Sequence, residues 1–590
     1  MNGFLRRMNI AQSVNLNIRV SGKSICKVFK HHKGKSMKKV YLSLLIVLAL
    51  IAPTFAQTKF KLDVKAKAAA ADITAAQIRD YLSFVASDEM EGRDTPSRGL
   101  DTTAKFIATM LSRWGVKPAG DNPASYFQKM NLVRDTIDGA KTSLELNGEK
   151  YPFGDDFIRV SGANVNALSA PLVFGRDGWF VKAKNFDAFD GVDVKGKIVV
   201  LYSNGISNGF SLTPLPNGLT RTDLTGVRGV DWADPLSYAT SKGAVGVIVV
   251  ASPQTQENWA QTRAQFSRGR ARVEKFETAT GSGVPNAALP VILVSQKLGA
   301  NLFNGETTNP LTASETAKAF DLNVNKKATL NIALKPEIVV TQNVIGMIEG
   351  SDPILKKEFV AVGAHYDHIG ITQNANGTDK INNGADDDGS GTVAILAIAE
   401  ALAKVAKKPK RSVLFVWHCG EEKGLWGSEY FTRFPTVDLK SVVTQLNIDM
   451  IGRSKKPGDA NPANKDLSGT NDVYVIGSKM MSAQLGTLSE QVNNAYLKVG
   501  FDYRYDDTKD PNRFFFRSDH FNYAKNGVPI IFYFDGVHED YHRVGDEYEK
   551  IDYDKMQKVT RTVFMTMWAV ADLKARPIVD KQLPAELTRR

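Results

Sequence analysis

The chain has 590 residues and a formal net charge of +12, a length that accommodates two or three domains. The positive charge does not indicate a nucleic acid partner, because residues 1–56 contain ten Lys or Arg and no acidic residue. The remainder has 65 basic and 63 acidic residues, so it is nearly neutral and we expect no polyanionic partner.

The first 56 residues have the pattern of a targeting leader. Met37 opens a short basic segment, residues 40–52 are an apolar run of 13, and Ala56 closes a short stretch that ends in a small residue. This order is typical of a secretory signal peptide, and the run is too short to span a membrane comfortably. We predict cleavage after Ala56, export to the periplasm or the cell exterior, and no stable membrane insertion. Residues 1–36 are interpreted as an over-extended start, and 37–56 as the signal peptide.

Two cysteines are present, Cys26 and Cys419, and only Cys419 lies outside the predicted leader. The exported chain would therefore have no internal disulfide bond, although export generally permits them. A fold of this size can bury enough apolar surface without one.

The chain after the leader begins with two predicted helices. Between residues 73 and 116, apolar residues recur at helical spacing in two segments, which a charged turn containing glycine separates. From about 126 to 160 the pattern changes to short alternating strands. We assign residues 57–155 to the N-terminal part of a domain that resumes at residue 331.

A second unit is predicted over residues 160–330. It contains a strand at 198–202, a helix-like segment running into a strand at 237–250, and a strand followed by a helix at 289–303. An Arg-rich segment at 263–272 has a single aromatic residue. Nucleic acid binding generally combines basic and aromatic side chains, so we interpret this segment as a solvated face.

From residue 339 to the end, strands and helices alternate regularly. This alternation is typical of an α/β fold with a mostly parallel sheet flanked by helices. The predicted strands cover residues 342–350, 358–365, 411–422 with its polar turn, 442–452, 472–478 and 528–536. The predicted helices cover residues 392–405, 483–500 and 552–575.

Side chains that bind metals follow the ends of these predicted strands. They are His365, Asp387, Glu421, Glu422, Asp449 and His542. The carboxyl ends of parallel strands meet at one edge of a sheet, so side chains from separate strands can converge there. Imidazole and carboxylate ligands without a thiolate suit a catalytic zinc.

Each motif taken alone has an ordinary structural explanation. A histidine such as His365 near a strand end can be a core residue bonded to a neighbour. Three aspartates before Gly-Ser-Gly often make a turn or a helix cap, and a Glu-Glu pair after a strand is usually solvated. Asp449 is different, because a lone carboxylate at the end of an apolar strand needs a partner. The combination and its order are more specific than any member.

This combination resembles the co-catalytic di-zinc exopeptidases of metallopeptidase family 28, the group of aminopeptidase S and glutamate carboxypeptidase II. The matching motifs, all within about 330–575, are GAHYDH, GADDDGSG, GEEKGLWGS, NIDMIG, RSDHFNYAKNGVP and DYHRVGDEYEKID. The N-terminal segment VASDEMEGRDTPSRGL also matches. The unit at 160–330 resembles the protease-associated domain that many of these enzymes carry as an insertion.

The resemblance implies the zinc exopeptidase fold, which is a mostly parallel mixed sheet flanked by helices. It also implies an inserted β-rich α/β protease-associated domain and a catalytic domain over 331–590. Two zinc ions per chain are expected. By motif, His365 and Asp449 would bind one zinc, Glu422 and His542 the other, and Asp387 would bridge the two.

Three further residues receive catalytic roles from the resemblance. Glu421 would be the general base, Asp367 would orient the imidazole of His365, and Tyr541 is a candidate oxyanion donor. The sequence departs from the family pattern at Asp386, a position that is often Asn. We keep Asp387 as the bridging residue because it directly precedes Asp-Gly-Ser-Gly.

The resemblance predicts a zinc aminopeptidase that removes N-terminal residues by attack of a metal-activated water, with peptides bearing a free N-terminus as partners. The direction of cleavage rests on spare acids that would hold an α-ammonium group. These acids are Asp386, Asp388, Asp519, Glu539 and Asp540.

Three alternatives remain open. A glutamate-type carboxypeptidase would need an arginine for the substrate carboxylate, and Arg453, Arg513 and Arg517 are the candidates. A glutaminyl cyclase would share the fold and use one zinc. A non-catalytic protein would bind partners through the inserted domain. Side-chain preference and oligomeric state do not follow from the sequence.

Overall fold

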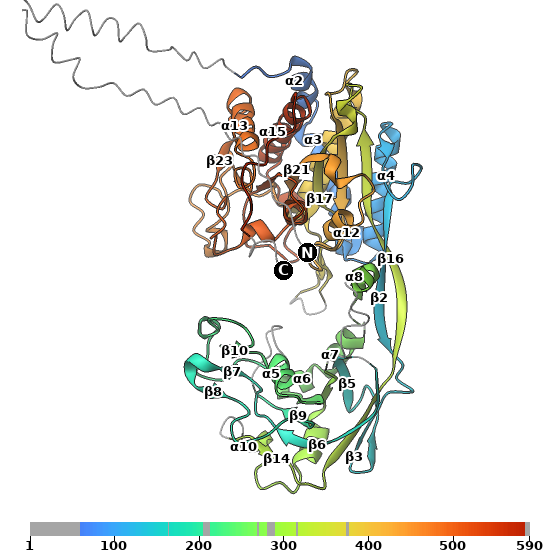
Figure 1. Cartoon of the computed structure of the whole chain (residues 1–590), viewed down its shortest axis with the longest axis vertical. Coiled ribbons are helices and arrows are strands. Elements are labelled where there is room, and N and C mark those ends of the chain that lie inside the picture. Colours follow the sequence, from blue (N-terminus) through green and yellow to red (C-terminus); the bar gives the residue numbers. More distant parts are fainter. Residues whose placement is uncertain are drawn as a thin grey trace, which may run out of the picture. The chain divides into compact units, whose positions relative to one another are not determined.

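The computed structural model describes residues 60–162, 164–204, 213–267, 269, 271–279, 289–313, 317–372 and 377–584 (Figure 1). The predicted leader and its cleavage site lie outside these residues. Among the helices of this described part, none combines the length and apolar character needed to cross a membrane.

A main sheet forms the centre of the part that carries the predicted site. Four neighbouring strands in its middle, β20, β17, β21 and β24, run parallel. They span Ser412–His418, Phe359–His365, Val442–Ile448 and Ile530–Phe534. The remaining strands of this sheet are β1 (Lys117–Pro118), β2 (Phe127–Ile137), β12 (Ala271–Val273), β16 (Leu334–Ile348), β22 (Asp472–Ile476) and β23 (Gly500–Asp502). The predicted mixed, mostly parallel sheet is confirmed in the region of the predicted site.

Helices cover both faces of this sheet, because its central strands are apolar on both sides. Alternate residues of β17 divide between the faces: Val360 and Val362 join one core, and Ala361 joins the other. The first core takes α2 (Val64–Ala71), α3 (Ala75–Val85), α4 (Arg98–Arg113), α11 (Gly391–Lys404), α13 (Ala483–Ala495) and α15 (Tyr553–Ala571). The second takes α12 (Trp426–Arg433) and α14 (His520–Lys525).

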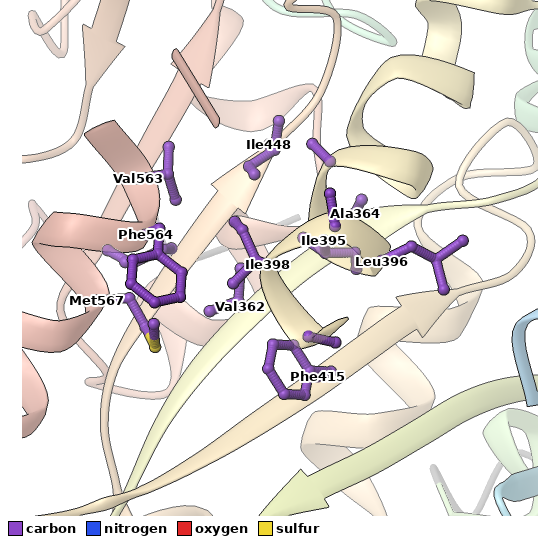
Figure 2. Packing of buried hydrophobic residues seen from close by; sticks show 14 of the residues in the cluster. Val362, Ala364, Ile395, Leu396, Ile398, Phe415, Ile448, Val563, Phe564 and Met567 are labelled. Atoms are coloured by element: carbon purple, nitrogen blue, oxygen red, sulfur yellow. The ribbon is translucent and has the colours of Figure 1, made fainter. Parts of the chain in front are cut away.

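Helix α11 is buried on nearly all sides, which fits its almost wholly apolar sequence. Figure 2 shows its side chains among those of the strands and of α15. The labelled residues are Val362, Ala364, Ile395, Leu396, Ile398, Phe415, Ile448, Val563, Phe564 and Met567. This packing holds the first turn of α11, and with it the three aspartates, against the ends of the strands.

A second sheet lies between β2 and β16 in the sequence. Its strands are β4 (Glu149–Tyr151), β3 (Ser143–Leu146), β15 (Lys327–Ile332), β6 (Val165–Phe174), β9 (Ile198–Leu201), β11 (Gly246–Val250), β13 (Val291–Val294) and β5 (Phe157–Ser161), with β14 (Phe320–Asp321) pairing to β6. It has an apolar cluster on each face. Helices α5 (Pro235–Ser241) and α9 (Gln296–Phe303) pack on it. The assignment of 160–330 to a protease-associated domain stays a prediction.

The chain enters the second sheet from β2 and returns through β16. These two strands pair antiparallel over their full common length, from Phe127 opposite Val344 to Ile137 opposite Leu334. Residues 138–333 are therefore an insertion into a β-ribbon of the main sheet. The short strand β12 is the exception, since it comes from the insertion but pairs with β2.

We predict that the main sheet folds without the insertion. Replacing residues 138–333 by Asn-Gly would join Ile137 to Leu334, and Asn-Gly suits a two-residue turn between antiparallel strands. The shortened protein should unfold cooperatively in a circular dichroism melt and should retain zinc by elemental analysis, since every predicted site residue lies after residue 333.

Its midpoint should be lower than that of the full chain, because it loses β12 and the Phe276 ring, which lies 6.2 Å from that of Tyr430. The substitution Phe276→Ala in the full chain measures that contact separately. A folded but metal-free shortened protein would contradict the assignment of all ligands to the main sheet.

Candidate metal centre and active site

The predicted metal ligands lie at the carboxyl edge of the parallel strands. His365 is the last residue of β17, and Asp449 directly follows β21. Glu421 and Glu422 follow β20 after a short turn, and Asp387 lies in the turn Ala385–Ser390 that leads into α11. Because these strands are parallel neighbours, their ends bring the side chains to one place.

The first group of donors surrounds the imidazole of His365. Its Nε2 lies 3.2 Å from Oδ1 of Asp387, 3.7 Å from Oδ1 of Asp449 and 3.9 Å from Oε2 of Glu421. His365 is almost completely buried, and so are the two aspartates. The structure therefore brings together the three residues that the sequence assigned to one zinc site.

The second group of donors uses the other oxygen of Asp387. Nε2 of His542 lies 3.0 Å from Oδ2 of Asp387 and 3.2 Å from Oε2 of Glu422. Asp387 thus presents one oxygen to each group, which is the arrangement expected of a bridging carboxylate.

His368 belongs to the second group, although the sequence analysis gave it no role. Its Nδ1 lies 3.0 Å from Oε1 of Glu422 and 3.7 Å from Oδ2 of Asp387. The ring is fully buried, and neither nitrogen has a hydrogen-bond partner among the described residues. Its position three residues after His365, just past the strand end, was the signal available in the sequence.

These donors fit zinc. Oδ2 of Asp387 and Oε1 of Glu422 are buried without a hydrogen-bond partner in the described part of the chain, as are both nitrogens of His368. Such orphaned groups are costly unless a ligand satisfies them. The donor atoms of His365, Asp387 and Asp449 lie within 4.8 Å of one another, as do those of His368, Asp387 and Glu422. Imidazole and carboxylate donors in groups of three, with no thiolate, are those of a catalytic zinc site.

The two adjacent glutamates differ in charge. Burial and the charge of Asp387 oppose ionisation of Glu422, but the imidazoles of His368 and His542, 3.0 and 3.2 Å from its oxygens, outweigh them and lower its pKa to about 2. Burial instead raises the pKa of Glu421 well above its usual value, although the charge of His365 opposes this. Glu422 is thus suited to bind a cation, and Glu421 is suited to carry a proton.

Asp367 lies where the sequence placed it, but its contacts are more specific than expected. Nδ1 of His365 lies 3.1 Å from the main-chain carbonyl oxygen of Asp367 and 3.7 Å from its carboxylate. The carboxylate accepts a hydrogen bond from the backbone N–H of Glu421 at 3.1 Å. Asp367 therefore supports both the imidazole of His365 and the turn that carries Glu421.

Tyr541 lines the same pocket. Its ring stacks on that of His542, with 3.9 Å between the ring centres, and its hydroxyl oxygen accepts a hydrogen bond from Arg517 at 3.2 Å. Burial raises the pKa of Tyr541, so the hydroxyl remains protonated and able to donate.

The pocket around these groups combines acid and apolar walls. Its carboxylates are Asp387, Glu421 and Asp449. Its apolar wall consists of Met450, Phe514, Phe532, Phe534 and Val537. Arg517 is the one Lys or Arg among the described residues that line it.

The five spare acids do not line this pocket. Asp386 accepts a hydrogen bond from the N–H of Gly452 at 2.6 Å, and Asp388 accepts one from the N–H of Gly391 at 2.8 Å. Asp519 faces His418, Glu539 accepts from Asn464, and Asp540 binds Arg453. The expectation that these acids hold an α-ammonium group is not supported.

The three candidate arginines differ in whether they line the pocket. Arg453 is nearly buried, with an ion pair to Asp540 at 2.9 Å. Arg513 lies over the ring of Phe516, outside the residues that line the pocket. Arg517 alone among them reaches the pocket.

Arg93 ties the N-terminal segment to the loops that carry the ligands. Its fully buried guanidinium donates to the carbonyl oxygens of Val85, Tyr366, Asn383 and Gly384 at 2.6–2.9 Å. Burial lowers its pKa to about 10, so the group is still charged at neutral pH. Asn383 and Gly384 directly precede the aspartate turn and Tyr366 directly precedes Asp367, so Arg93 holds the two loops together.

We predict that His368→Ala weakens zinc retention roughly 10- to 100-fold, the range typical when a partner of a metal site is removed. Competition with a chromogenic chelator measures it. His520→Ala is the matched control, because His520 is equally buried but bonds the carbonyl of Phe515 instead of the donor groups. Equal zinc retention in the two folded variants would contradict a role for His368 at the metal centre.

Comparison with known proteins agrees with this site. Residues 343–567 match the model of Peptidase family M28. A probable zinc metalloprotease from Pyrenophora tritici-repentis is 29% identical over 278 residues, 41% of this chain and 54% of the relative. Leucine aminopeptidase 2 from Arthroderma otae is 27% identical over 259 residues, 44% of this chain and 43% of the relative. The chain thus spans about half the length of these curated relatives.

Among solved structures, a zinc aminopeptidase from Bacillus subtilis overlays with a TM-score of 0.47 at 18% identity. The overlay covers 84% of this chain and 94% of that one. The family match rests instead on the sequence of the region that holds all the donors. The resemblance to metallopeptidase family 28 is confirmed over this region, because residues 343–567 match the model of Peptidase family M28.

Proposed function

We propose that this protein is an exported, zinc-dependent exopeptidase that removes N-terminal residues from peptides. The observation that carries the proposal is the pair of donor groups that share Asp387, with Glu421 beside them. Such a pair accommodates two zinc ions, and we propose two per chain. When bound, zinc polarises the scissile carbonyl and lowers the pKa of the attacking water.

The remaining chemistry falls to the chain's own side chains. Glu421 accepts the proton of the attacking water and returns it to the leaving amine, because it lies beside the first donor group and its raised pKa suits proton transfer. Tyr541 keeps its proton and donates a hydrogen bond from its hydroxyl group to the developing oxyanion. Asp367 keeps His365 and the Glu421 turn in position through the contacts described above.

The amino-end direction is supported by the relatives named leucine aminopeptidase 2. The carboxypeptidase alternative has one observation in its favour, which is Arg517 in the pocket. A glutaminyl cyclase with one zinc would leave the second donor group unused. A purely binding role would leave the whole arrangement unexplained.

Export is part of the proposal and rests on the charged start, the apolar run and the small residue at Ala56. It is supported by the sequence alone. N-terminal sequencing of secreted or periplasmic protein should find Gln57, or a residue within a few positions of it, as the first residue. A chain that still carries residues 1–36 would contradict both the cleavage site and the assigned start.

The direction is tested with two forms of one peptide, with a free amine and with an N-acetyl group. Mass spectrometry should show stepwise loss of residues from the free amino end, while the acetylated form stays intact. Zinc content is measured on the same sample, and two ions per chain are expected. Removal of the C-terminal residue from the acetylated peptide at a comparable rate would establish the carboxypeptidase instead.

Two variants separate the roles of the adjacent glutamates. Glu421→Gln should retain both zinc ions and lose nearly all turnover, on the order of 10²- to 10⁴-fold, because it removes the proton acceptor. Glu422→Gln should lose zinc from the second group as well, because it removes a donor. If Glu421→Gln loses zinc while Glu422→Gln keeps it, the two roles are reversed.

A further inference from the structure

Arg517 is a positively charged residue in the same pocket as the proposed zinc ligands. It follows the short turn Phe514–Phe516, its side chain is exposed, and it lines the pocket together with His365, Asp387 and Asp449. A permanent positive charge beside a zinc site is electrostatically unfavourable. The carboxylates that line the pocket are assigned to the metal groups and to proton transfer, so the charge of Arg517 is available to an anion of the substrate.

The guanidinium is held in place but is not neutralised. One N–H donates to the hydroxyl oxygen of Tyr541 at 3.2 Å, and the group lies 5.1 Å from the centre of the Phe514 ring. Its contacts among the described residues are with Tyr541 and Phe514, and no ion pair to a carboxylate is among them. Arg453, by contrast, has an ion pair with Asp540.

An arginine fixed in this way is prepared for a carboxylate. The guanidinium has five donors in a planar fork, and one is used by Tyr541, so an edge remains for two parallel hydrogen bonds to a carboxylate. The aromatic ring and the tyrosine hydroxyl limit its freedom, which reduces the entropy lost on binding. A lysine at this position would offer a point charge without the fork.

We propose that Arg517 binds a carboxylate of the peptide substrate and so directs the enzyme toward short or acidic peptides. This inference rests on the proposed exopeptidase function. The carboxylate has two sources of the same chemistry, which are the free C-terminus of a dipeptide and an Asp or Glu side chain beside the scissile bond. Either source places a negative charge within one residue of the reacting carbonyl.

Matched substrates distinguish these sources. Leu-Leu against Leu-Leu-amide tests the C-terminal carboxylate. Leu-Glu-amide against Leu-Gln-amide tests a side chain in the second position, and Glu-Leu-amide against Gln-Leu-amide tests the first. The wild-type enzyme should show a kcat/KM about 10-fold or more higher for the charged member of at least one pair, since a charged hydrogen-bonded contact is worth that much.

The variant Arg517→Gln should bring that ratio close to one, and Arg517→Lys should restore only part of it. Arg513→Gln is the matched control, because Arg513 lies four residues earlier on the Phe516 ring and does not line the pocket. Its ratio should equal that of the wild type. The preference should appear mainly in KM, and calorimetry of the Glu421→Gln protein with the same pairs should show it without turnover.

Each result decides one question. If no peptide with a free amine is cut, the proposed function fails. If peptides are cut but the wild-type ratios are near one for all three pairs, or if the preference survives in Arg517→Gln, the carboxylate role of Arg517 is overturned. If Arg517→Gln lowers kcat equally for charged and neutral members, Arg517 acts only through Tyr541, and the inference is overturned as well.

Discussion

The structure depends on partners for the carboxylates that are buried at the carboxyl edge of the main sheet, because these partners replace the hydrogen bonds lost to water. Removing a carboxylate from water costs several kcal/mol unless partners replace the water, and here Asp386, Asp387 and Asp388 are buried in one turn. Each has a different partner. Backbone N–H groups bond Asp386 and Asp388, the imidazole of His538 also faces Asp386, and the imidazoles of His365 and His542 face Asp387. Of the three, Asp387 is the one that lines the pocket, and its Oδ2 has no hydrogen-bond partner in the described part of the chain, so it is the one suited to bind metal.

The same division appears among the histidines. Three imidazoles, those of His365, His368 and His542, face the two donor groups. The other three histidines outside the leader lie away from the donor groups: His418 faces Asp519, His520 bonds the carbonyl of Phe515, and His538 faces Asp386. Residue type alone does not assign a role, because residues of one type differ in their burial and in the groups that they contact.

Sequence patterns could locate the donors because the carboxyl ends of parallel strands lie at one edge of the sheet. A correct prediction of where the strands end was therefore enough to bring together His365, Asp449 and the Glu421–Glu422 pair. The bridging position of Asp387 followed from its motif. Patterns could not show that Asp386 and Asp388 are consumed by backbone N–H groups, since those partners come from distant segments. For the same reason the position of His368 was missed, and the Arg-rich segment gave no sign that Arg272 of β12 forms an ion pair with Asp135 of β2.

The contacts of Arg93 determine when, during folding, the loops of the metal centre take their final shape. Its acceptors at Tyr366, Asn383 and Gly384 lie 273, 290 and 291 positions further along the chain. These contacts close very long loops, and long-range contacts form late and slowly. The ligand loops are thus shaped only after the N-terminal segment and the whole insertion have been made. A chain threaded unfolded through a membrane would acquire its zinc on the far side, from the metal supply of that compartment.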